Sequence, residues 1–72
     1  MKQLDLHGIL HRNVEKIVID FVHRHDTPFK IITGNSQAMK DIVLSALCHF
    51  SLDAHEESSY NKGALIVFEK RE

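Results

Sequence analysis

The sequence of 72 residues contains little that would cross-link or interrupt a small fold: one cysteine, one proline and three glycines. Because Cys48 cannot pair within the chain, a disulfide framework is excluded, and a reducing compartment is expected. No apolar run approaches the roughly 18 residues of a membrane span, and the opening MKQLDLHG lacks the apolar centre of a signal peptide. We therefore expect a soluble, cytoplasmic protein that has no membrane partner.

An excess of charge of one sign is also missing. Nine Lys and Arg residues stand against ten Asp and Glu residues, so the net charge is −1 when the six histidines are neutral. This balance excludes a positive field over the whole molecule, and any phosphate site must be local. With 43% hydrophobic residues, the chain is apolar enough for one small domain over residues 1–72 and is not typical of a disordered segment.

Hydrophobic periodicity predicts six elements. Alternating leucines indicate a strand over about residues 2–7, and an apolar stripe then indicates a helix that begins at its cap, Asn13, and closes before the DTP segment. FKIIT at 29–33 is the second strand, and a second helix follows its cap, Ser36. A weak strand signal lies around 52–56, and the strongest one is at 64–69. The expected buried stripes are Val14, Ile17, Val18, Phe21 and Val22 in the first helix and Met39, Ile42, Val43, Ala46, Leu47 and Phe50 in the second.

The order of these elements predicts the architecture. Strands separated by helices pair in parallel through right-handed crossovers, whereas the last two strands are close enough in sequence to form an antiparallel hairpin. We therefore expect an α/β chain of the α+β two-layer type, βαβαββ, in which two helices cover one face of a four-stranded mixed sheet.

The segment LDLHG is the first candidate for chemistry. Residues two apart in a strand share a face, so Leu4 and Leu6 should lie under the helices while Asp5 and His7 face solvent at the carboxyl end of the strand. Gly8 permits a sharp turn there. A carboxylate beside an imidazole can manage proton transfer at a phosphodiester, and ligands gather at this edge of open sheets. The alternative is a polar strand face without chemistry.

The segment TGNS, which begins at Thr33, follows the second strand and precedes a helix. Backbone N–H groups and the positive end of the helix dipole make such a junction a candidate anion site, and Gly34 allows close approach. Asn35 and Ser36 belong to the same turn, and Lys40 lies one helical turn further on. An ordinary capped turn is the alternative. If the first two strands are neighbours, DLHG and TGNS lie side by side and form one phosphate site.

The histidines do not by themselves identify a metal site. His7 with His11, or His23 with His25, could ligate zinc, but one cysteine gives no closed four-ligand pattern. The sequence identifies no cofactor, and Mg²⁺ and Mn²⁺ are the ions with which cleavage is to be tested.

Taken in order, these segments resemble the Smr (small MutS-related) domain family. The resemblance rests on LDLHG at 4–8, the amphipathic helix after it, IITGNS at 31–36 in place of the TGxG or HGxG signature, and KGALIVF at 62–68, where the family has a glycine before its last strand. It covers nearly the whole chain. It implies a fold similar to the C-terminal domain of bacterial translation initiation factor three, with strand order 1-2-4-3 and the fourth strand antiparallel to the rest.

The resemblance also implies nicking or cleavage of DNA or RNA. If the family's roles apply to the matching positions of this sequence, Asp5 and His7 are catalytic candidates. Residues of the TGNS loop are then candidates for nucleic-acid contact. One departure is that serine replaces the second loop glycine; serine can cap the helix and can itself bond phosphate. The full set of candidate nucleic-acid-binding residues is Gly8, Thr33, Gly34, Asn35, Ser36 and Lys40.

Two functions follow from this interpretation. The first is a nicking endonuclease on branched, nicked or structured DNA or RNA, which the intact Asp5 and His7 pair favours. The second is a non-catalytic module that binds nucleic acid or a protein, which the mildly acidic composition favours. Because Smr domains are commonly appended to larger proteins, a larger partner that supplies targeting is also expected.

Overall fold

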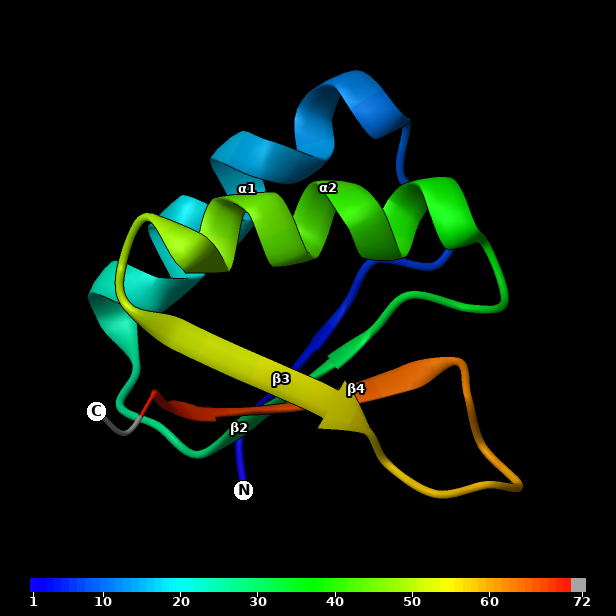
Figure 1. The fold of residues 1–72 in the computed structure, drawn as a ribbon. Helices are drawn as coiled ribbons and strands as arrows, with labels where there is room; N and C mark the ends of the chain where they lie inside the picture. The colour runs from blue at the N-terminus through cyan, green and yellow to red at the C-terminus, as the bar shows by residue number, and fades with distance from the viewer. Residues whose placement is uncertain (71–72) are drawn as a thin grey trace.

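The computed structural model describes residues 1–70 and contains the six elements in the predicted order (Figure 1). The strands form one mixed sheet in the order β1-β2-β4-β3. β1 pairs with β2 in parallel, and β4 is antiparallel to both β2 and β3. The βαβαββ two-layer arrangement and the implied strand order are thereby confirmed. The elements are β1 (Gln3–Asp5), α1 (His11–Arg24), β2 (Phe29–Ile32), α2 (Gln37–Cys48), β3 (Leu52–Glu56) and β4 (Ala64–Glu69).

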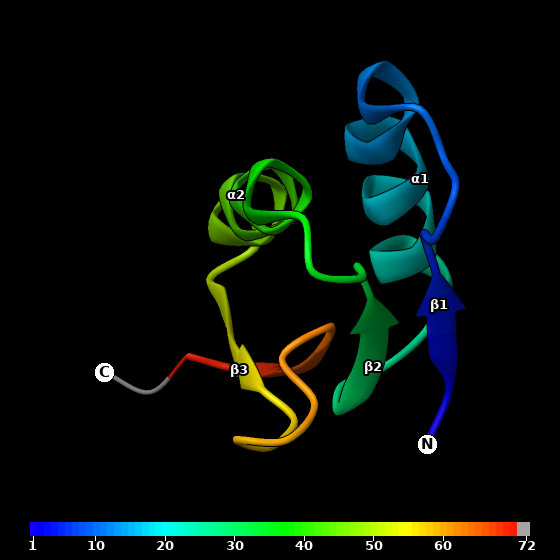
Figure 2. The same cartoon turned by 90° about the vertical axis from the view of Figure 1, so that its right-hand side faces the viewer.

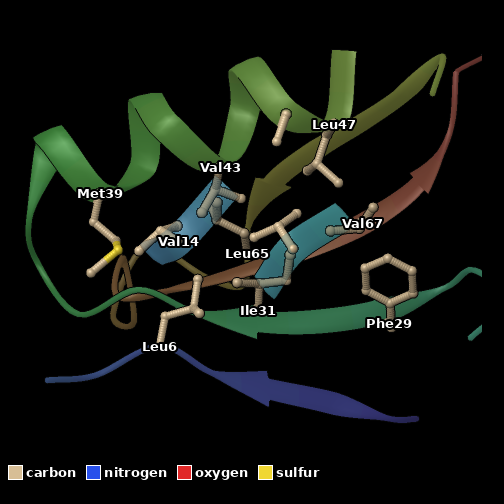
Figure 3. Packing of buried hydrophobic residues seen from close by; sticks show 11 residues of the cluster. Leu6, Val14, Phe29, Ile31, Met39, Val43, Leu47, Leu65 and Val67 are labelled. Carbon is tan, nitrogen blue, oxygen red and sulfur yellow. The ribbon is translucent and has the colours of Figure 1, made fainter. Parts of the chain in front are cut away.

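Both helices lie on one face of the sheet, and one core fills the space between the two layers (Figures 2 and 3). The register pairs Phe29 with Val67 and Ile31 with Leu65, so alternate residues of the central strands point toward the helices. Neither helix in the described part of the chain is long and apolar enough to cross a membrane. The buried core consists of Leu6, Val14, Val18, Phe29, Ile31, Met39, Val43, Ala46, Leu47, Leu65 and Val67.

The predicted helix stripes are correct at their centres and only partly buried at their margins. In α1, Ile17, Phe21 and Val22 are half-buried, and in α2 the same holds for Ile42. Phe50 lies beyond the end of α2 and is also half-buried. A two-layer fold covers each helix on one side only, so residues at the margin of a stripe keep contact with water.

The start of α1 differs from the prediction. The helix begins at His11, and its cap is Leu10, whose side chain makes no capping hydrogen bond. Asn13 therefore lies inside the first turn, and its N–H donates to the carbonyl of Leu10 at 2.9 Å. The physical reason is a tight turn after β1, in which the N–H of Ile9 donates to the carbonyl of Leu6 at 3.0 Å and brings the chain into the helix early.

The carboxyl ends of β1, β2 and β3 meet at one edge of the sheet. Three connections leave from this edge, residues 6–10, 33–36 and 57–63, and Figure 2 views the molecule from this side. We call these three connections, together with Asp5, the carboxyl edge. Backbone hydrogen bonds join them: Leu6 N–H donates to Ile32 at 2.8 Å, and Thr33 N–H donates to Gly63 at 2.8 Å. The fold therefore places the LDLHG and TGNS segments side by side.

Candidate functional site

Asp5 and His7 lie at the carboxyl edge with their side chains in solvent. Asp5 is the last residue of β1, and His7 follows in the turn outside the strand. Leu6 between them is fully buried, and Leu4 packs against the core. The predicted alternation is therefore confirmed, although the strand ends two residues earlier than expected.

One hydrogen bond defines the geometry of this pair. An oxygen of the Asp5 carboxylate, Oδ1, accepts from the backbone N–H of His7 at 2.9 Å. The His7 ring makes no hydrogen bond within residues 1–70. Gly8 follows with φ of +81°, a conformation that favours glycine, and open space surrounds the position of its missing Cβ. The turn thus holds one carboxylate oxygen and leaves the imidazole free to meet a ligand.

The first half of the TGNS loop is engaged within the fold. Thr33 is only 3% exposed, and its Oγ1 donates to the carbonyl of Gly34 at 2.9 Å. The N–H groups of Thr33 and Gly34 both donate to the carbonyl of Gly63, at 2.8 and 3.0 Å. A phosphate could take these donors only by breaking the link to the third connection. Thr33 and Gly34 therefore position the loop.

The second half of the loop is open. Ser36 Oγ accepts from the N–H of Met39 at 3.1 Å, which confirms the predicted cap of α2. The backbone N–H groups of residues 35–38 donate to no group within residues 1–70. Such donors at a helix start, reinforced by the helix dipole, suit an anion. The free donors therefore begin at the residue after the loop glycine, Gly34.

Lys40 is directed elsewhere. Its side chain is 11% exposed, and its Nζ lies 3.4 Å from Oε2 of Glu56 on β3. This ion pair spans α2 and the helix-facing side of the outer strand. The structure therefore places Lys40 against β3, with its charge already compensated.

The third connection, residues 57–63, contains a second compensated acid. Glu57 pairs with Lys30 of β2, and Asn61 Nδ2 donates to its other oxygen at 2.9 Å. The hydrogen bond from Lys30 holds the pKa of the Glu57 carboxyl below its usual value, although partial desolvation opposes this effect. Within residues 1–70 no three histidine, cysteine or acidic side chains cluster as metal ligands.

Tyr60 and Lys62 lie in the same connection, and the sequence analysis did not single them out. Both are exposed. The signal that could have found them is a lone aromatic beside a lysine in the polar stretch SSYNKG. Their place at the carboxyl edge depends on the pairing of Gly63 with the TGNS loop, which is a contact between distant parts of the sequence.

Comparisons of the chain with family models, with curated proteins and with solved structures found no match. The Smr resemblance therefore stays a proposal, and its support is the motif residues and their arrangement at the carboxyl edge.

Proposed function

We propose that this chain is an Smr-type nucleic-acid-acting domain that nicks or cleaves structured DNA or RNA. The observation that carries the proposal is the LDLHG turn, in which Asp5 and His7 are exposed at the sheet edge where ligands bind in open α/β folds. The hydrogen bond that the His7 backbone N–H donates to the Asp5 carboxylate fixes this turn. A carboxylate and an imidazole in a defined turn suit proton transfer better than two side chains on a flexible tail.

The proposed chemistry divides between the two side chains. Cleavage of a phosphodiester requires a base that accepts the proton of the attacking hydroxyl and an acid that protonates the leaving oxygen. The Asp5 carboxylate is the proposed base, since only one of its oxygens is used by the turn. The His7 imidazole, whose ring makes no hydrogen bond within residues 1–70, is the proposed acid.

The free N–H groups of residues 35–38 are the proposed contact for a neighbouring phosphate. Ser36 contributes the cap that orients them, and Gly8 leaves open space beside the turn. Thr33 and Gly34 are assigned a supporting role, because their donors are used by Gly63. Lys40 has no role in this proposal.

A second candidate function is a non-catalytic module that binds nucleic acid or a protein partner. The observation that favours it is the same hydrogen bond, because an aspartate that caps its own turn has a structural reason to be there. In that case the edge would bind without cleaving.

The test is incubation of the purified protein with supercoiled plasmid and structured RNA, in Mg²⁺, in Mn²⁺ and in EDTA. We expect cleavage that Asp5→Asn removes without loss of folding, because an amide oxygen can still accept the His7 N–H. His7→Ala should reduce the rate by about 10²-fold or more if the ring transfers a proton. Binding without cleavage would favour the second candidate function.

Matched controls separate catalysis from general effects of charge. Asp53→Asn alters an exposed aspartate of β3 whose Oδ1 also accepts a backbone N–H, that of Ala54 at 2.8 Å. His49→Ala alters an exposed histidine at the far end of α2. Both controls should cleave at the parent rate. Unchanged cleavage by Asp5→Asn would remove the carboxylate from the mechanism.

A further inference from the structure

The connection at 57–63 is an ordered loop. Ser58 Oγ accepts from the N–H groups of Tyr60 and Asn61 at 3.2 and 3.0 Å, and Asn61 Oδ1 accepts from Gly63 N–H at 3.3 Å. At its two ends, Glu57 N–H donates to Ala64 at 2.8 Å, and Gly63 receives the donors of the TGNS loop. Whatever this loop presents to solvent is therefore held in a defined position.

What it presents is an unpacked aromatic ring. Tyr60 is 98% exposed, whereas the other exposed large apolar residues of the described chain range from 39 to 73%. The four phenylalanines, by contrast, are buried or half-buried. An aromatic side chain has much surface to bury, and its ring faces are free to stack here.

The same loop carries a positive charge two residues from Tyr60. Lys62 makes no ion pair within residues 1–70, whereas the nearby acids Glu56 and Glu57 are paired with Lys40 and Lys30. The loop thus carries an uncompensated cation although the whole chain has a net charge of −1. An exposed aromatic face next to a free ammonium group matches an unpaired nucleotide, which offers a base to stack and a phosphate to neutralise.

Contact between backbones sets the position of this loop relative to the catalytic turn. A Cβ added at Gly63 would lie 3.2 Å from the Cα and carbonyl carbon of Gly34, so a side chain there would push the two connections apart by a few tenths of an ångström. Ile32, the residue before the TGNS loop, in turn accepts a hydrogen bond from Leu6, the residue after β1. The connection at 57–63 and the LDLHG turn therefore leave the sheet at the same edge (Figure 2).

We infer that Tyr60 stacks on an unpaired base and that Lys62 contacts its phosphate, so that the domain selects nucleic acid that presents single-stranded nucleotides to the carboxyl edge. This inference rests on the proposed function and specifies its substrate class. Fully paired duplex offers no free base face to Tyr60 and is the disfavoured substrate.

Tyr60 itself reports the contact, because it is the only tyrosine in a chain without tryptophan. Stacking on a base quenches tyrosine emission. The experiment titrates the full chain with a fluorescein-labelled single strand, a gapped duplex and a fully paired duplex at low salt. Probe anisotropy measures binding, and protein emission measures stacking. We expect binding with quenching for the first two probes and weaker binding for the third.

Variants quantify the contributions. Tyr60→Ala should weaken binding of the single strand by about 5- to 150-fold, whereas Tyr60→Phe should bind like the parent. Lys62→Ala should lower the slope of log affinity against log salt by about 0.7 for the single strand. Lys70→Ala, at the opposite end of β4, is the matched control and should leave the slope unchanged.

The outcomes separate the inference from the proposed function. Binding without quenching, or equal affinity of Tyr60→Ala and the parent for the single strand, would overturn the inference and leave the proposed function standing. Absence of binding for all three probes, together with absence of cleavage, would overturn both.

Discussion

The two strand-to-helix connections of this molecule look alike in sequence and differ in structure. LDLHG and TGNS each end a parallel strand, contain a glycine with positive φ and lead into a helix. In the second, the donors of Thr33 and Gly34 are used by Gly63, and Ser36 caps α2. In the first, only one internal side-chain hydrogen bond forms, and the helix cap has none. The first half of the second connection is part of the framework, whereas the first connection and residues 35–38 are open to a ligand.

Substitution of the two positive-φ glycines should show this difference most strongly. A non-glycine residue in this region costs about 1–3 kcal/mol. Gly34→Val should fall at the upper end, because its N–H is fixed to Gly63 and the backbone cannot relax. Gly8→Val should fall at the lower end, because the Gly8 N–H makes no hydrogen bond within residues 1–70 and the backbone can relax. Urea unfolding measures both variants, and equal losses would contradict the contrast between the two connections.

The two helix caps should respond in opposite directions. Ser36→Ala removes the acceptor of the Met39 N–H and should lower the free energy of unfolding by about 1 kcal/mol. Leu10→Ser supplies α1 with the capping oxygen that the helix lacks. This substitution should raise the free energy of unfolding by about 1 kcal/mol. Thermal or urea unfolding measures the stability of both variants. A loss of stability in Leu10→Ser would show that the first connection is more constrained than its hydrogen bonds indicate.

The smallest expected effect concerns the ion pair that supports the third connection. Because the folded state lowers the pKa of Glu57, this carboxylate stabilises the protein above the ordinary value of 4.5, and its contribution is lost as pH falls through the lowered value. Glu57→Gln should therefore be less stable than the parent at neutral pH, and the difference should shrink below about pH 4.5. Glu15→Gln, at an exposed position of α1, is the control. A difference that is independent of pH would contradict the assignment.

The elements were predictable because their signals are local. Strict alternation identified β1, a β-branched run identified β2, and serine at 36 identified the start of α2. The start of α1 was missed because the Leu6 to Ile9 turn competes with the Asn13 cap. Local signals were sufficient where no second signal competed with them.

The site was only partly predictable, because the decisive partners are far apart in sequence. Exposure of Asp5 and His7 follows from strand periodicity alone. The burial of Thr33 depends on Gly63, 30 residues away, and the direction of Lys40 depends on Glu56, 16 residues away. Neither pairing can be read from the residues around the loop.

The most direct test of the central claim, that the carboxyl edge is a nucleic-acid site, is the change in backbone amide NMR shifts when a short single-stranded oligonucleotide is added at low salt. The account predicts shifts at residues 6–10, 35–38 and 60–62, together with small changes at Thr33 and Gly34, whose N–H groups stay bonded to Gly63. Shifts confined to the outer face of α1 or to the opposite end of the sheet would contradict it.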